Sequence, residues 1–149
     1  EDIKALLRAG ARVTAIEMDL RNLGSTELQI RLGFKQVAGF NAPGYSSTTP
    51  VVLPAGSGWV RATFPIDPSA YTAINDPASF TSVFGGDMFG ELRILHATEP
   101  TLTGTNIAGA LGVDNIRAVP SPAAAPLLLV AGLARRRRRG PSVDGRFIG

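Results

Sequence analysis

The chain has 149 residues and a net charge of +3, and its lack of cysteine excludes disulfides and thiolate metal sites. The length suits one domain of ordinary size. Residues 1–134 carry 9 Lys and Arg against 11 Asp and Glu, whereas residues 135–149 carry 6 Arg and 1 Asp, so the body has no basic surplus and nucleic acid is excluded as its partner.

Alternating apolar and polar side chains predict β-strands in the first part of the chain. After a short helix expected at residues 2–9, this alternation runs through residues 13–23 and again through residues 27–34. The polar turn between the two runs predicts that they pair as an antiparallel hairpin. In the second run, Arg31 belongs to the polar set that we expect to face solvent.

Shorter runs with the same pattern predict further strands at residues 36–40, 59–66, 91–97 and 113–119. A second short helix is expected at residues 76–84, after an N-capping Asp and a Pro, and residues 41–58 are expected to form a long loop. Solvated outer faces favour an all-β antiparallel sandwich over a parallel sheet. Over residues 12–119 the alternation, the Trp-containing strand and the last strand resemble jelly-roll sandwiches of the galactose-binding and carbohydrate-binding-module kind.

The sequence predicts no catalytic residue and no cofactor. Glu17 and Asp19 share a strand face, but glycosidic chemistry needs two carboxyl groups about 5 to 9.5 Å apart across a cleft, so we interpret them as solvated strand charges. For Asp114 and Asn115 a turn or strand-end cap is the favoured interpretation, and calcium binding is the alternative. His96, the single histidine, is predicted to be a core or rim residue rather than a general base.

Sugar binding needs exposed aromatic platforms beside polar groups. Trp59 shares a strand face with Arg61 and Thr63, opposite the apolar residues of the same strand, and this parity favours an outward or edge position. Tyr45 lies in the preceding loop. Together, Trp59 and Tyr45 are the candidate sugar-binding residues, and a shared groove would distinguish a carbohydrate-binding module from the alternatives.

The tail has an apolar stretch followed by five arginines. Residues 122–134 are 13 apolar residues, fewer than the roughly 20 that cross a bilayer, so we expect a marginal hydrophobic helix. The prolines disfavour helix before residue 126. The cytoplasmic stop-transfer cluster is Arg135, Arg136, Arg137, Arg138 and Arg139. By the positive-inside rule the domain would lie outside and the C-terminus inside; the alternative is a buried helix beside a solvated or nucleic-acid-binding run.

The order of these features resembles the PEP-CTERM sorting signal of bacterial exported and envelope proteins. Val119, Pro120 and Pro122 match the short motif, followed by the apolar stretch and the arginines. The resemblance implies an exosortase-type sorting enzyme and the inner membrane as partners. It implies localisation in the bacterial cell envelope, with secretion as the alternative.

These features divide the chain into three parts. Residues 1–118 form a β-sandwich domain, residues 119–139 form a sorting signal, and residues 140–149 form a flexible tail. We expect the chain to be the C-terminal part of a longer exported protein, since no export signal is visible. The leading hypothesis is a non-enzymatic envelope protein, a surface or matrix component. The alternatives are a carbohydrate-binding module with a polysaccharide partner and the non-catalytic C-terminal part of an exported hydrolase.

Overall fold

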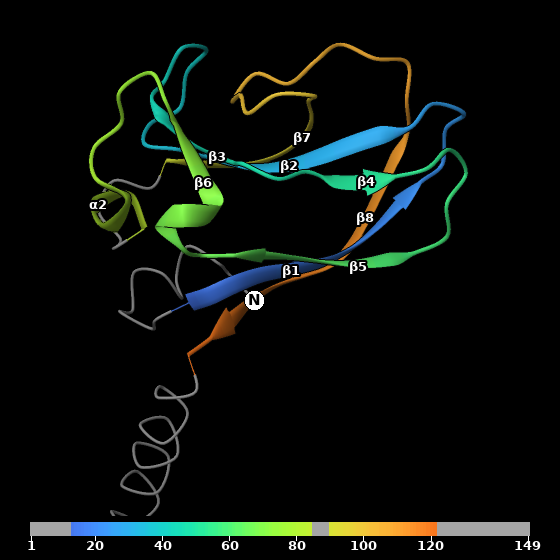
Figure 1. Ribbon diagram of the computed structural model, residues 1–149, viewed down its shortest axis with the longest axis horizontal. Helices are drawn as coiled ribbons and strands as arrows, with labels where there is room; N and C mark the ends of the chain where they lie inside the picture. The colour runs from blue at the N-terminus through green and yellow to red at the C-terminus, as the bar shows by residue number, and fades with distance from the viewer. Residues whose placement is uncertain (1–12, 85–89, 122–149) are drawn as a thin grey trace, which may run out of the picture.

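The computed structural model describes residues 13–84 and 90–121. Their main feature is two antiparallel β-sheets packed face to face, with one short α-helix at one end (Figure 1). The elements are β1 Val13–Asn22, β2 Leu28–Lys35, β3 Gly44–Ser47, β4 Val51–Leu53, β5 Val60–Pro65, a 3₁₀ turn Pro68–Ala70, β6 Tyr71–Ile74, α2 Phe80–Phe84, β7 Glu91–His96 and β8 Leu111–Pro120. The expected antiparallel β-sandwich is therefore confirmed.

The core lies between the two sheets and follows the period-two pattern of the two central strands. The three-stranded sheet has the order β5-β1-β8, and in the five-stranded sheet β2 pairs with β7 on one side and with β3 and β4 on the other. The fully or almost fully buried apolar side chains of β1 and β2 are Ile16, Met18, Leu20, Leu28, Ile30, Leu32 and Phe34. Burying each contributes about 1.5 to 3 kcal/mol, so these two strands supply much of the driving force for folding.

An aromatic cluster closes one end of this core, beside α2. The Phe34 ring packs edge-on against Tyr71 and Phe84, with ring centroids 5.6 and 4.4 Å apart. Phe80 stacks against Phe84 at 4.0 Å. The short helix is therefore held by aromatic packing on the sandwich, because five residues are too few to be stable alone.

The hairpin expected between residues 13–23 and 27–34 is wrong. β1 pairs with β5 and β8, whereas β2 pairs with β3, β4 and β7, so the two strands belong to different sheets. Each strand has one apolar face, and facing each other across the core buries both faces at once. The turn between them carries the chain from one sheet to the other.

Other predicted elements have mixed outcomes. The strand expected at residues 36–40 is a turn, and the loop expected at residues 41–58 contains β3 and β4. The predicted helix begins at Phe80 rather than 76, because Asn75 and Asp76 have φ angles of +58° and +51° and form a turn. The helices expected at residues 2–9 and in the apolar tail lie outside the described residues. So does the flexible tail 140–149.

The charged residues on the outer face of β2 are buried, which corrects the expectation that Arg31 faces solvent. Arg31 is 3% exposed and Lys35 is 0% exposed. The Arg31 guanidinium donates to four backbone carbonyls, those of Ser47, Thr48, Ala97 and Thr98. The Lys35 ammonium donates to the carbonyls of Gly39 and Phe40. Each cation therefore fastens a loop over the outside of the five-stranded sheet.

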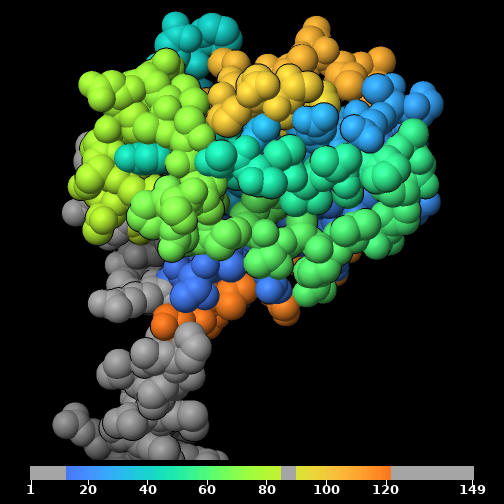
Figure 2. All heavy atoms as spheres, in the orientation of Figure 1, coloured from blue at the N-terminus to red at the C-terminus, as the bar shows by residue number. Residues whose placement is uncertain are grey.

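Two segments make this cover, and both lie at the top of the molecule in the space-filling view (Figure 2). One is the turn after β2, and the other is the loop between β7 and β8. Leu102 of that loop is buried, and a Cβ on Gly33 would lie 3.0 Å from its Cδ2 atom. Arg31 also spans the break between β3 and β4, where β2 changes partner from Ser46 to Val51. The central strand β2 is thus covered on both faces over most of its length.

Candidate binding face on the three-stranded sheet

The outer face of the three-stranded sheet is exposed and polar, and the strand register arranges its side chains in three rows. The register pairs Glu17 with Thr63 and Arg117, Asp19 with Arg61 and Asp114, and Arg21 with Gly112. Trp59 directly precedes β5 and extends the third row, since its neighbour Val60 pairs with Leu20. Successive rows are about 6.6 Å apart along the strands.

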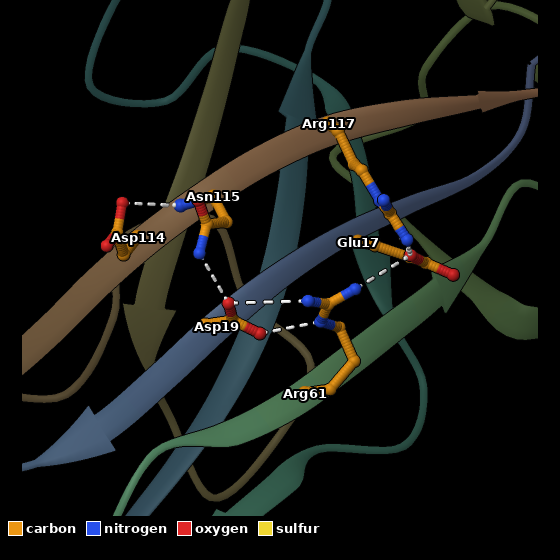
Figure 3. A network of polar contacts seen from close by, with 6 residues as sticks. All are labelled: Glu17, Asp19, Arg61, Asp114, Asn115 and Arg117. Atoms are coloured by element: carbon orange, nitrogen blue, oxygen red, sulfur yellow. Dashed lines mark hydrogen bonds and ion pairs between the residues drawn. The ribbon is translucent and has the colours of Figure 1, made fainter.

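The first two rows form a network of ion pairs around β1 (Figure 3). Arg61 lies between the two carboxylates, with its Nε 2.6 Å from Asp19 Oδ1 and its Nη1 3.5 Å from Glu17 Oε2. Arg117 Nε donates to Glu17 Oε2 at 2.9 Å from the other side. Glu17 and Asp19 therefore do share one face, as expected, and each is neutralised by an arginine from a neighbouring strand.

These contacts favour the ionised carboxylate of Asp19. The hydrogen bond from Arg61, followed by that from Asn115, holds the pKa of Asp19 below its ordinary value of 3.8. The same contact with Asp19 raises the pKa of Arg61. A general acid at neutral pH needs the opposite shift, a raised carboxyl pKa, so this pair is built for charge pairing rather than for proton transfer.

Asp114 and Asn115 lie at a bulge in β8. The pairing shifts by one residue between Glu17 and Asp19 of β1, and Asn115 takes a φ of +50°, a conformation that Asn tolerates better than most residues. Its side chain donates to Asp19 Oδ2 at 2.7 Å, and its backbone N–H donates to Asp114 Oδ1 at 2.7 Å. Among residues 13–84 and 90–121, no cluster of three or more His, Cys, Asp or Glu side chains has the arrangement for a metal ion.

Trp59 is 52% exposed, and its indole lies across the end of the sheet. A Cβ on Gly112 would lie 3.2 Å from the Cη2 atom of Trp59 and 3.6 Å from Cβ of Arg21. Because β1 runs between β5 and β8, the ring crosses β1 beside Arg21 and rests on the glycine. The outward position expected from strand parity is in agreement with this placement.

Tyr45 lies elsewhere, in β3 of the other sheet. Its ring is half-buried and packs 5.2 Å from the Phe80 ring centroid, and its hydroxyl donates to the carbonyl of Ala78 at 2.8 Å. Tyr45 thus belongs to the aromatic cluster beside α2, and Trp59 belongs to the outer face of the three-stranded sheet. The structure does not bring the two candidate sugar-binding residues together.

His96 ends β7 and has a structural partner. Its Nδ1 accepts a hydrogen bond from the backbone N–H of Gln29 at 2.9 Å, so this imidazole is the Nε2–H tautomer. The ring is half-buried, beside the segment where Ala97 donates to the Gln29 carbonyl. This is a rim position, in agreement with the predicted core or rim placement.

A pocket of about 280 Å³ opens between the break after β3 and the end of β5. Its lining includes the hydroxyl residues Ser47, Thr48, Thr63 and Ser69 and carries no charged side chain. Tyr71 also lines it, and burial raises the pKa of this phenol. The pocket therefore offers neutral hydrogen-bonding groups and no acid or base.

The proposed sorting motif begins inside the folded part of the chain. Val119 and Pro120 are the last two residues of β8 and pair with Ala15 and Val13. β8 thus continues two residues past 118, the residue at which the sequence separates the sandwich from the sorting signal. Pro122 and the five arginines lie outside the described residues. Within the described part, no helix is long and apolar enough to cross a membrane.

Comparison with known proteins identifies no family for the chain. No protein-family model, no curated protein and no solved structure matches it. Sandwiches of this general kind host many unrelated functions, so function has to be argued from particular residues. Of the residues on the candidate face, the sequence alone missed Arg21 and Gly112, although a glycine inside a strand is a recognised sign of a close approach.

Proposed function

We propose that this chain is a non-enzymatic module of an exported or cell-envelope protein, with a jelly-roll-like sandwich followed by a PEP-CTERM-like sorting signal. The observation that carries the proposal is the position of the last strand. β8 ends at Pro120, between the motif residues Val119 and Pro122. The folded module and the address that would sort it are therefore directly adjacent, with no intervening linker.

The composition of the segment beyond β8 supports the membrane part of this proposal. Thirteen apolar residues and five arginines follow in that order, which suits a temporary hold in the inner membrane with the arginines on the cytoplasmic side. An exosortase-type enzyme is the partner that this pattern implies. The module then resides outside the membrane, or is released as a surface or matrix component.

The paired carboxylates support the non-enzymatic part. Glu17 and Asp19 are the pair that a hydrolase hypothesis would use, and arginines hold both. Carbohydrate binding is the second candidate function, and one observation favours it, the half-exposed indole of Trp59. Nothing in the geometry favours the third hypothesis, a hydrolase fragment.

A fractionation experiment tests the sorting proposal. An exported reporter fused to the chain should associate with membranes before processing, and deletion of residues 126–139 should move it to the soluble exported fraction. Deletion of residues 140–149 is the matched control and should leave the membrane association unchanged. If the 126–139 deletion fractionates like the intact fusion, the anchor and the sorting signal are both ruled out.

A further inference from the structure

The third row of the exposed face contains an aromatic ring that the fold does not bury. In Trp59, 52% of the surface is in contact with solvent. Exposed tryptophans are uncommon and are enriched where proteins bind partners. One edge of the indole rests on Gly112, where an added Cβ would lie 3.2 Å from the ring and would require the ring to shift slightly. The glycine therefore lets the ring lie along the sheet and present its outer surface.

The charge beside this ring is also unusual. Arg61 and Arg117 are both committed to the carboxylates of Glu17 and Asp19. Arg21, in the same row as Trp59, is exposed, and its side chain has no hydrogen bond or ion pair within residues 13–84 and 90–121. In the first two rows these arginines offset Glu17 and Asp19, while Asp114 has no ion pair among the described residues. In the third row, Arg21 carries a positive charge that no described carboxylate pairs with.

A planar apolar surface beside an unpaired guanidinium indicates a ligand with both an apolar face and a negative charge. Sugar rings have an apolar C–H face that packs on an aromatic ring, and a guanidinium binds a carboxylate through two parallel hydrogen bonds. In the adjacent row, Asp114 is exposed, and the backbone N–H of Asn115 bonds to its Oδ1. Carboxylate oxygens of this kind accept hydrogen bonds from sugar hydroxyls.

We propose that Trp59 and Arg21, supported by Gly112, bind an acidic polysaccharide on the outer face of the three-stranded sheet. One sugar ring stacks on the indole, and its carboxylate pairs with Arg21. This site refines the carbohydrate-binding candidate and does not depend on the sorting signal. It replaces the pairing of Trp59 with Tyr45, because Gly112 adjoins the ring and Arg21 lies beside Gly112 in the same row.

The face is shallow and has one stacking platform, so each site binds weakly. Affinity for a polymer arises from many repeated sugar units and from several copies of the protein on one surface. Such binding suits a component that remains attached to an acidic envelope polysaccharide. Because the contact depends on a charge, it weakens as the salt concentration rises.

The test is affinity electrophoresis of the 149-residue chain in gels containing polygalacturonate, alginate or neutral dextran, with Arg135 to Arg139 replaced by Gln in every variant so that the basic tail does not bind the acidic polymers. The two acidic polymers should retard the protein and dextran should not. Trp59→Ala and Arg21→Gln should each weaken the retardation at least tenfold. The matched controls are Val52→Ala, an exposed apolar residue on the other sheet, and Arg117→Gln, a charge change two rows away. Both controls should bind like the parent chain.

The outcomes separate this site from the broader candidate function. Equal retardation by dextran, insensitive to Arg21→Gln, would keep carbohydrate binding and overturn the acidic ligand. Retardation that survives Trp59→Ala would overturn the proposed face, as would an absence of retardation by both acidic polymers. Thermal unfolding of each variant confirms that it is folded, which we expect because Trp59 and Arg21 are exposed.

Discussion

The outer faces of the two sheets begin from the same kind of sequence and end in different surroundings. β1 presents Glu17, Asp19 and Arg21 outward, and these side chains remain in contact with solvent. β2 presents Arg31 and Lys35 away from the core, and loops bury both. Period-two alternation therefore decides which side of a strand a residue occupies, but it does not decide whether that side is exposed to solvent.

The partners of the cations differ accordingly. On the exposed face, Arg61 and Arg117 pair with carboxylates, where water and salt weaken each pair. Under the loops, Arg31 bonds to four backbone carbonyls, two of them in buried contacts and two in part-buried ones. Burial lowers the pKa of Arg31, an effect that the nearby Glu99 opposes. A buried guanidinium is retained only when hydrogen bonds satisfy it.

The largest expected effect comes from removing the buried cation. Arg31→Met keeps most of the side-chain volume but leaves the carbonyls of Ser47, Thr48, Ala97 and Thr98 without this donor. We expect the free energy of unfolding to fall by about 3 to 5 kcal/mol, since each unsatisfied buried group costs about 1 to 3 kcal/mol and some regain water. Urea denaturation of both chains measures the difference.

The same substitution on the exposed face is the control. Arg117→Met removes a guanidinium that is 56% exposed and pairs only with Glu17 among the described residues, and it should cost less than about 1 kcal/mol. Similar losses in the two variants would contradict the contrast between the faces. Hydrogen exchange adds a second measurement, because Arg31→Met should deprotect the segment after Ala97 selectively.

The next effect concerns the apolar contact that holds the covering loop. Leu102→Ala should destabilise the protein by about 2 to 3 kcal/mol, because the buried isobutyl group packs on Gly33 and its loss leaves a cavity. Val52→Ala, on the same outer face but 50% exposed, should change stability by less than about 0.5 kcal/mol. Equal effects would mean that the loop adds no stability to the sheet.

The local alternation of apolar and polar residues was sufficient to predict the long strands but not to predict which strands pair. β1, β2, β5, β7 and β8 were predicted from alternation, because each has several inward apolar residues. β3, β4 and β6 have three or four residues each, too few for a period to appear, and Gly and Pro around them mimic a loop. The hairpin error has a different origin, since a polar turn can either return a strand beside its predecessor or carry it across the core.

The candidate face was also predictable only in part, because alternation along a strand is local and strand pairing is not. Parity along one strand was enough to place Trp59 on the same side as Arg61. Its neighbours Arg21 and Gly112 come from two other strands, and only the register brings them into its row. Register depends on long-range pairing and on the bulge at Asn115, neither of which a single sequence specifies.

The smallest expected effect concerns the exposed network and depends on pH. The pKa of Asp19 is lowered in the folded chain, first by Arg61 and then by Asn115. Its ionisation therefore stabilises the fold above its ordinary pKa of 3.8, and this contribution is lost as the pH falls through the lower folded-state pKa. Asp19→Asn should be slightly less stable than the parent chain at pH 7, and this difference in the free energy of unfolding should disappear towards pH 2.

Arg61→Gln provides the matched test, because it removes the strongest partner of Asp19. The stability difference between Arg61→Gln and the parent chain should show most of the pH dependence seen for Asp19→Asn. The double variant should lose less stability than the sum of the losses in the two single variants. A gap that persists unchanged at pH 2 would show that Asn alters packing rather than charge. In that case the exposed face, like the covered one, would be stabilised by its local geometry, and the contrast between the two would be limited to solvent contact.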